Sequence, residues 1–168
     1  IMQMADLRAE GKGGRLDEVM TAVVVDGRKG KEYRLATDLE REMAQKAGEK
    51  VEEVFEDIPF GIPDEPLPQG GGSGAGRAFS IPKYGFKTWG DLFTSRELNA
   101  LGTLVRTIRE FRGDRTESTT WMEALHVELA LGLNKLADRQ STICKWDTGR
   151  ETISNTFSRF ALPMMWDY

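Results

Sequence analysis

Apolar and polar residues alternate at helical spacing in four parts of the chain, and each part begins with the same polar signal. The pattern Thr-x-x-Glu starts at Thr37, Thr94, Thr120 and Thr148. In this capping box the Thr oxygen and the Glu carboxylate accept hydrogen bonds from backbone donors that the helix leaves unsatisfied. Because apolar residues follow each box at helical spacing, we expect a helix to start at each of these threonines.

The width of the apolar stripes predicts how deeply these helices are buried. Two stripes are narrow and consist of Leu39, Met43, Ala47, Val51 and Val54, and of Leu98, Leu101, Val105, Ile108 and Phe111. The third helix carries Leu125, Leu129, Gly132, Leu133 and Leu136, and it is also apolar off this stripe, at Val127, Ala130 and Leu131. We therefore expect it to be the central, most buried helix. The fourth helix carries Ile153, Phe157 and Phe160 and is expected to end before Pro163.

The first third of the chain predicts a β-hairpin. Val19 to Val25 is a β-branched apolar run, residues 26–30 supply turn residues, and Glu32 to Leu35 suit a returning strand. Two strands alone are marginally stable in water, so we expect the hairpin to pack on helices or on other strands. Residues 1–10 are expected to form a helical end that stops at Gly11.

A region rich in proline and glycine follows the second predicted helix. Five of the six prolines lie between Pro59 and Pro82, and no periodicity survives from Glu56 to Leu92. A loop this long divides the chain into a hairpin plus helix (1–57), the Pro/Gly loop (58–93) and a three-helix part (94–168). The predicted fold class is α+β, mainly helical, with about four or five helices and one hairpin on the N-terminal side, together forming one compact fragment.

Charge and cysteine content restrict the partners. The formal net charge of -4 argues against bulk nucleic acid or an anionic membrane as the main partner, although a local basic face is compatible with it. Cys144 is the only cysteine, so the chain contains no internal disulfide and no zinc ribbon of its own, which suits a reducing cytoplasm. No run approaches the ~18 consecutive apolar residues of a membrane span. We therefore expect a cytoplasmic protein that does not enter a membrane.

The sequence offers few candidates for catalysis. It contains no Walker A loop, His-Glu-x-x-His or Gly-x-Ser-x-Gly motif, and the tract Gly70 to Gly76 lacks the strand and helix that a phosphate cradle requires, so we interpret it as a flexible loop. His126 lies one helical turn after Glu123, which suits an acid/base pair, but a structural histidine is the favoured reading. Cys144 lies near Lys145, which would lower its pKa, but a packing role is favoured. An independent small enzyme that uses His126 or Cys144 is the least favoured reading.

A basic stretch near the end of the chain suggests contact with phosphates. Hydroxyl residues and Trp146 are interleaved there with Arg139, Lys145, Arg150 and Arg159. Such side chains, and helix N-termini like the one expected at Thr148, commonly bind phosphate oxygens. Nearby carboxylates at Asp138, Asp147, Glu151 and Asp167 leave local ion pairing and capping as an alternative. For a second basic run, at Arg106, Arg109, Arg112 and Arg115, we favour a role in stabilising a helix C-terminus.

Three stretches carry a resemblance to a known family. They are "YGFKTWGDLFTSRELNALGTLV" (Tyr84 to Val105), "LADRQSTICKWDTGRETISNTFSRFALPMMWDY" (Leu136 to Tyr168) and "IPDEPLP" (Ile62 to Pro68). In these stretches the chain resembles internal segments of the large bacterial and archaeal predicted adenine-specific DNA methylases that contain a zinc ribbon and an N-terminal domain of unknown function. The resemblance covers most of the chain from about Val19 onward.

The resemblance implies a parent enzyme whose catalytic motifs lie elsewhere. In that family a glycine-rich S-adenosylmethionine motif, Asp-Pro-Phe-x-Gly-Gly-Gly, lies upstream of such a stretch, and an Asp-Pro-Pro-Tyr catalytic motif lies downstream. Neither motif is present here, and the cysteines of the ribbon are also absent. No catalytic, cofactor-binding or metal-binding residue is therefore carried over, and this chain is expected to be inactive alone, with S-adenosylmethionine as the cofactor of the parent.

Two functional hypotheses remain. In the first, the chain is a DNA-engaging insert of the parent methyltransferase that uses Arg139, Lys145 and Arg150, with the Pro/Gly loop reaching the duplex. In the second, it is a structural or oligomerisation insert that contacts no DNA. The start at Ile1 and the apolar end at Leu162, Met164, Met165 and Trp166 suggest a segment of a longer polypeptide that packs against the remainder of the parent and, when alone, associates with itself.

Overall fold

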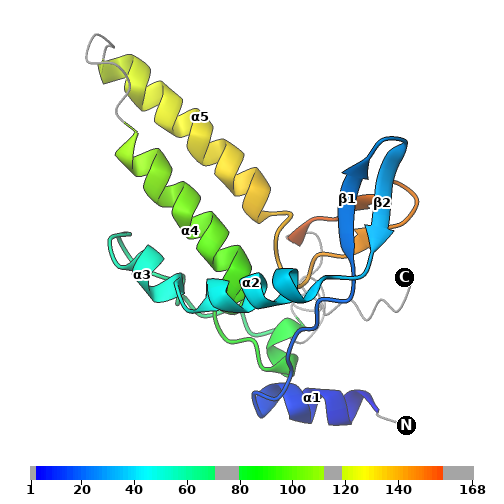
Figure 1. Ribbon diagram of the computed structural model, residues 1–168. Helices are drawn as coiled ribbons and strands as arrows, with labels where there is room; N and C mark the ends of the chain where they lie inside the picture. Colours follow the sequence, from blue (N-terminus) through cyan, green and yellow to red (C-terminus); the bar gives the residue numbers. More distant parts are fainter. Residues whose placement is uncertain (1–2, 71–79, 112–118, 157–168) are drawn as a thin grey trace.

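The computed structural model describes residues 3–70, 80–111 and 119–156. Within these residues the fold is α+β and dominated by helices, as predicted, with five α-helices and two separate antiparallel hairpins (Figure 1). The elements are α1 (Met4–Lys12), β1 (Val23–Gly27), β2 (Gly30–Arg34), α2 (Asp38–Gly48), α3 (Val51–Phe55), α4 (Ser95–Glu110), α5 (Thr119–Ala137), β3 (Trp146–Asp147) and β4 (Thr152–Ile153). Two short 3₁₀ turns, η2 (Ile81–Tyr84) and η3 (Gly90–Leu92), lie in the Pro/Gly region.

The predicted N-terminal hairpin is confirmed. β1 pairs with β2 from Val23 opposite Arg34 to Gly27 opposite Gly30. Gly30 has a φ of 122°, a conformation that side chains with a Cβ rarely adopt, which explains the glycine at this turn. The strand begins later than expected, because Val19 lies outside β1 and is exposed.

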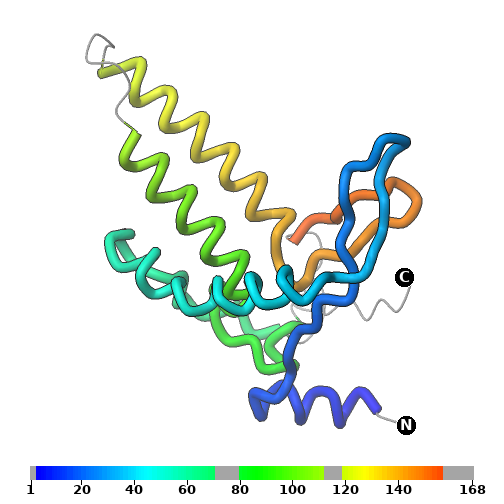
Figure 2. Tube along the Cα trace, viewed as in Figure 1, coloured from blue at the N-terminus to red at the C-terminus, as the bar shows by residue number. Residues whose placement is uncertain are grey.

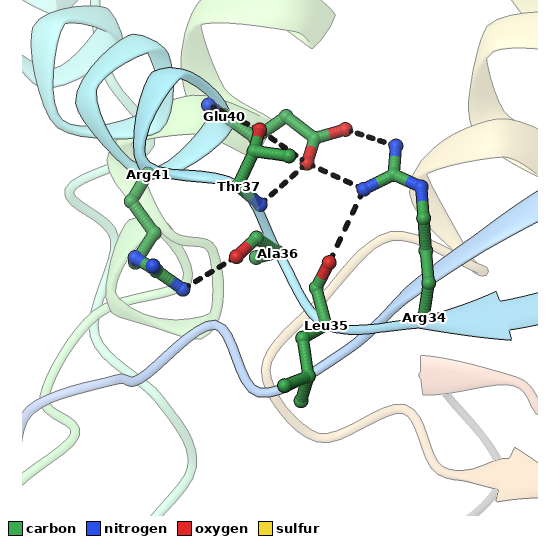
Figure 3. Close-up of polar contacts among 6 residues, drawn as sticks. All are labelled: Arg34, Leu35, Ala36, Thr37, Glu40 and Arg41. Atoms are coloured by element: carbon green, nitrogen blue, oxygen red, sulfur yellow. Dashed lines mark hydrogen bonds and ion pairs between the residues drawn. The ribbon is translucent and has the colours of Figure 1, made fainter.

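The capping box at Thr37 is formed as the sequence predicts. The Thr37 side chain accepts a hydrogen bond from the Glu40 amide, and the Glu40 carboxylate accepts one from the Thr37 amide at 2.8 Å. The same carboxylate pairs with the Arg34 guanidinium at 2.6 Å, so the end of β2 is fastened to the start of α2 (Figure 3). These contacts hold the pKa of Glu40 well below its usual value of 4.5. The hydrogen bond from Arg34 has the largest effect, and the hydrogen bonds from Thr37 come next.

This low pKa predicts a pH-dependent stability difference between the wild type and Glu40→Gln. A carboxylate whose pKa falls on folding stabilises the native state above its unfolded pKa, and that contribution is lost as the pH falls towards the folded pKa. The wild type should therefore resist urea better than Glu40→Gln at pH 7, and the gap should shrink steadily below about pH 4.5. Glu128→Gln, which makes the same substitution on the exposed surface of α5 and leaves the contacts of Glu40 intact, is the matched control. An equal pH dependence of stability in the two variants would contradict the claim that the contacts of Glu40 lower its pKa and stabilise the fold.

The helix expected from Thr37 to Val54 is broken, and only its second half is buried. α2 ends at Gly48, a poor helix former, and α3 continues from Val51 in a new direction. Val51, Val54 and Phe55 form a buried cluster that packs against partly buried side chains including Leu98 of α4. Leu39 and Met43 are 63% and 62% exposed, so the expectation that they share one core stripe with Val51 and Val54 was wrong.

α4 and α5 form an antiparallel helical pair that projects from the remainder of the molecule (Figure 1). The capping box at Thr94 is confirmed, whereas Thr120 lies inside the first turn of α5, which already includes Thr119. α5 contains no buried residue, so the prediction of a central, most buried helix was wrong. α5 packs on α4, but Leu129 of the predicted stripe is exposed, as are Val127 and Leu131, which lie off that stripe.

The Pro/Gly region is irregular, as predicted, but it contributes most of one core. Leu67, Ile81 and Leu92 are almost completely buried and cluster with Ile143, which lies beyond α5. The chain folds back on itself through an isolated bridge between Pro66 and Thr88, with the Leu67 amide donating to the Lys87 carbonyl at 2.8 Å. Gly71 to Gly76 of the predicted flexible tract lie outside the described residues.

A second hairpin replaces the fourth predicted helix. β3 and β4 pair through Trp146 opposite Ile153 and Asp147 opposite Thr152, and Thr148 lies in the turn between them. The Asp147 carboxylate accepts hydrogen bonds from the amides of Gly149 and Arg150, at 3.0 and 3.2 Å. This Asx turn gives the backbone donors an alternative to a helix, so the capping-box prediction at Thr148 was wrong. Phe157 and Phe160 of that predicted helix lie outside the described residues.

Candidate functional site

A pocket of about 400 Å³ lies where the start of α4 meets the chain that follows α5. The first two turns of α4 form one wall, and the segment from Arg139 to β4 forms the other. This volume is within the usual range of small-ligand sites, roughly 300–1,000 Å³. The lining residues are Arg96, Glu97, Ala100, Arg139, Gln140, Ser141, Cys144, Lys145, Trp146 and Ile153.

A hydrogen-bonded turn after α5 positions the floor of the pocket. The Thr142 amide and hydroxyl both donate to the Leu92 carbonyl, at 2.8 and 2.9 Å, which ties the turn to the core. The buried Ser141 and Thr156 hydroxyls lie 2.8 Å apart, and the Thr156 amide donates to the Asp138 carbonyl. These contacts fix the backbone on both sides of the pocket residues.

Hydrogen bonds to the segment around β4 hold Arg139 and Lys145, two basic residues of the pocket, in place. The Arg139 guanidinium donates to the Ile153 carbonyl at 3.0 Å. The Lys145 amide donates to the Ser154 hydroxyl at 3.0 Å, and the Lys145 carbonyl accepts from the Ser154 amide at 2.9 Å. Both residues are exposed and both line the pocket, so long cationic side chains extend from fixed backbone at its edge.

Trp146 is held in place by the N-terminal hairpin, which lies beside the second hairpin (Figure 2). The Tyr33 ring meets the indole edge-on at a centroid distance of 6.0 Å, and the Lys31 ammonium lies 5.5 Å from the indole centroid. The Lys31 ammonium also donates to the Glu151 carbonyl, and the Tyr33 hydroxyl donates to the Glu151 carboxylate at 3.2 Å. Partial burial and this carboxylate raise the pKa of Tyr33 above its usual value.

The pocket is locally cationic although the chain is acidic. Three cations line it, Arg96, Arg139 and Lys145, against one carboxylate, that of Glu97. The Glu97 carboxylate is engaged in the α4 cap, where it accepts from the Thr94 amide at 2.8 Å. Burial, together with the charge of Glu97, raises the pKa of the neighbouring Glu18, and Arg96 opposes that rise. Among the described residues, none of the three cations forms an ion pair within 4.0 Å.

The structure brings together three of the five residues that the sequence proposed for DNA contact. Arg139, Lys145 and Trp146 all line the pocket. Arg150 is exposed in the turn between β3 and β4 and does not line it, and Arg159 lies outside the described residues. The expected helix N-terminus at Thr148 is not formed, so it offers no amides to a phosphate.

Sequence reasoning missed three contributors to this site. Arg96 was recognised only as the third residue of a capping box, and its distance from Arg139 along the chain gives no signal that the two share a pocket. Tyr33 was expected only as a residue of the returning strand, and Lys31 lies between the expected turn and strand, so neither was assigned to a site. Their alternation on β2 places both on one face of the strand, which was the available signal that they share a neighbour.

The other catalytic candidates have structural partners. His126 lies on α5, and its Nε2 is 3.0 Å from the Phe111 carbonyl, so the ring bridges α5 and the end of α4. The Cys144 thiol lies 3.2 Å from the Thr156 hydroxyl and donates to the Asp138 carbonyl. In the second basic run, Arg106 pairs with Glu110 one turn later at 4.0 Å, while Arg112 and Arg115 lie outside the described residues.

The pocket does not suit S-adenosylmethionine or a metal ion. The methyl donor carries a sulfonium cation, whereas the described lining has three cations and its one carboxylate is engaged in the α4 cap. Within residues 3–70, 80–111 and 119–156, no group of three or more His, Cys, Asp or Glu side chains could hold a metal ion. The described lining, with three cations beside Trp146, instead suits an anionic ligand.

Comparisons with known proteins do not assign this chain to a family. No family model matches it, and no curated protein or solved structure is significantly similar to it. The structure adds one further finding: no helix in the described part of the chain is long and apolar enough to cross a membrane.

Proposed function

We propose that this chain is a non-catalytic DNA-recognition segment of an S-adenosylmethionine-dependent DNA adenine methyltransferase, and that its pocket contacts the phosphate backbone of DNA. The observation that carries the proposal is the convergence of Arg96, Arg139 and Lys145 beside Trp146. Arginine and lysine are common donors to DNA phosphates, whose charge they neutralise. The assignment to a methyltransferase rests on the resemblance of Tyr84 to Val105 and Leu136 to Tyr168, and it places the chain in the cytoplasm with the remainder of the parent enzyme as its partner.

The small number of cations fits a supporting contact better than a complete DNA-binding domain. Each neutralised phosphate releases bound counterions, so affinity and its salt dependence both grow with the number of phosphate contacts. Three cations on a chain with a net charge of -4 predict weak binding at low salt and little binding at physiological salt. Other parts of the parent would then supply most of the affinity for DNA.

Lys145→Ala tests this proposal directly. Fluorescence anisotropy with a labelled duplex at low salt should show roughly tenfold weaker binding, because a charge-assisted phosphate contact is lost. Lys50→Ala removes the same charge at an exposed position between α2 and α3, outside the pocket, and should bind as the wild type does. Absence of binding by the folded wild type at low salt, or equal losses in the two variants, would contradict the proposal.

The second candidate function is a structural or oligomerisation segment with no DNA contact. The observation that favours it is the exposed apolar surface of α5, where Trp121, Val127 and Leu131 are each more than half exposed. Apolar faces of this kind usually mark protein interfaces. Self-association measured by sedimentation across a concentration series, with no binding to DNA at low salt, would favour this function over the first.

A further inference from the structure

The shape of the pocket restricts which part of a DNA molecule can enter it. An intact duplex presents its phosphates on the outside and its base edges in the grooves, but the flat faces of its bases are stacked on one another and closed to a protein pocket. A hollow of about 400 Å³ is larger than a single phosphate contact requires and has the size of a small-ligand site. A nucleotide that is not base-paired can fill such a hollow with its base.

The lining also has the two chemistries that an unpaired nucleotide requires. Trp146 and Ile153, directly opposite each other across β3 and β4, supply an apolar wall that a phosphate alone would not use. Arg139 and Lys145, which carry cationic groups, line the same pocket. Aromatic side chains beside a positively charged groove are the usual means by which proteins hold single-stranded DNA, because every base has a flat face that stacks.

The indole is already fixed in the structure without DNA. Tyr33 meets it edge-on, and Lys31 lies over the ring while its ammonium is bonded to the Glu151 carbonyl. Arg139 is likewise anchored, on the Ile153 carbonyl. Side chains that are ordered before binding lose less entropy when the ligand arrives, so these contacts favour a binding role for the pocket.

We propose that this pocket holds one unpaired DNA nucleotide, with its base packed against Trp146 and its phosphate on Arg96, Arg139 and Lys145. This inference rests on the proposed function and extends it, because it names the form of DNA that the pocket prefers. The site performs no chemistry on the nucleotide. It holds a nucleotide that has left the duplex.

The test compares three labelled duplexes of equal length by fluorescence anisotropy. One is fully paired, one carries a single unpaired thymidine, and one carries an abasic residue at that position. The wild type should bind the duplex with the unpaired thymidine about tenfold more tightly than either of the others, which is the fold-change expected for one stacked base. The abasic duplex retains the backbone distortion but lacks the base, so it separates base recognition from DNA flexibility.

Two variants test whether Trp146 is the source of the preference for the unpaired thymidine. Trp146→Leu should reduce the preference for the unpaired thymidine to less than twofold, whereas Trp121→Leu, at an exposed position on α5 outside the pocket, should retain it. If Trp146→Leu does not fold, the comparison of thymidine with the abasic residue on the wild type still decides the question.

The outcomes separate this inference from the function on which it rests. Equal binding of all three duplexes, with the loss in Lys145→Ala retained, would overturn the unpaired nucleotide but leave the phosphate contact standing. A preference that survives in a folded Trp146→Leu variant would also overturn it. Failure of the folded wild type to bind any of the three duplexes at low salt would overturn both.

Discussion

Gly85→Ala is expected to destabilise the protein by about 3 kcal/mol, because backbone strain and a steric clash act together there. Gly85 has a φ of 99°, in the region that side chains with a Cβ rarely adopt. A Cβ at this position would lie 2.1 Å from the Gly11 carbonyl oxygen, and a Cβ on Gly11 would lie equally close to the Tyr84 carbonyl. The two chain segments cross backbone to backbone, so neither can yield by rotating a side chain. Urea unfolding of the variant and the wild type measures the loss.

Gly14→Ala is the matched control for this crossing. Gly14 also has a positive φ, of 67°, but no atom lies within 4 Å of the position that a Cβ would occupy. It should therefore lose only the strain, roughly 1 kcal/mol. If Gly85→Ala loses no more stability than Gly14→Ala, the close contact between α1 and η2 is contradicted.

Leu92→Ala is expected to cost about 3 to 5 kcal/mol of unfolding free energy. Leu92 is fully buried among Leu67, Ile81 and Ile143, and its carbonyl accepts the two Thr142 hydrogen bonds that fix the pocket floor. Removing its side chain leaves a cavity that this closely tied segment cannot easily fill. Thermal and urea unfolding should both show the loss.

Leu39→Ala provides the comparison for Leu92→Ala. Both substitutions remove the same atoms, but Leu39 is 63% exposed on α2, so its change should fall within about 0.5 kcal/mol of the wild type. A large loss at Leu39, or a small one at Leu92, would show that the packing of α2 and of the Pro/Gly region differs from that described above.

The sequence predicted those elements whose signals are local. The capping boxes at Thr37 and Thr94 and the first hairpin depend on residues a few positions apart, and all three are formed. The box at Thr148 failed because Asp147, one residue earlier, accepts hydrogen bonds from the amides of Gly149 and Arg150 and so closes a turn there. The motif indicates that donors need acceptors there, but it does not show which acceptor is used.

Burial was harder to predict than secondary structure, because it depends on what an element meets. The all-round apolar character of α5 indicated a central helix, yet α5 packs on α4 and leaves Val127 exposed. The Pro/Gly region has no apolar period, yet it supplies Leu67 and Ile81 to a core. Backbone hydrogen bonds between distant segments, such as those from Leu67 to Lys87 and from Thr142 to Leu92, bring such segments together, and no spacing in the sequence encodes them.

The sequence predicted only part of the candidate site, because only some of its residues are close together along the chain. Arg139, Lys145 and Trp146 lie within eight residues of one another, so their clustering was apparent before any fold was known. Arg96 joins them only through the packing of α4 against the turn after α5, and Tyr33 only through the meeting of two hairpins. These contributions depend on tertiary structure.

The most direct test of the central claim is a map of the DNA contact on the chain itself. Backbone amide NMR spectra recorded during titration with a short duplex at low salt report which residues change environment. We predict that the shifts concentrate in segments 96–100 and 139–146 and at Ile153, which contain the residues that line the pocket, and leave the exposed face of α5 unchanged. Shifts centred on α5 or on the tip of the first hairpin, or no shifts at all from the folded protein, would contradict the claim that this pocket contacts DNA.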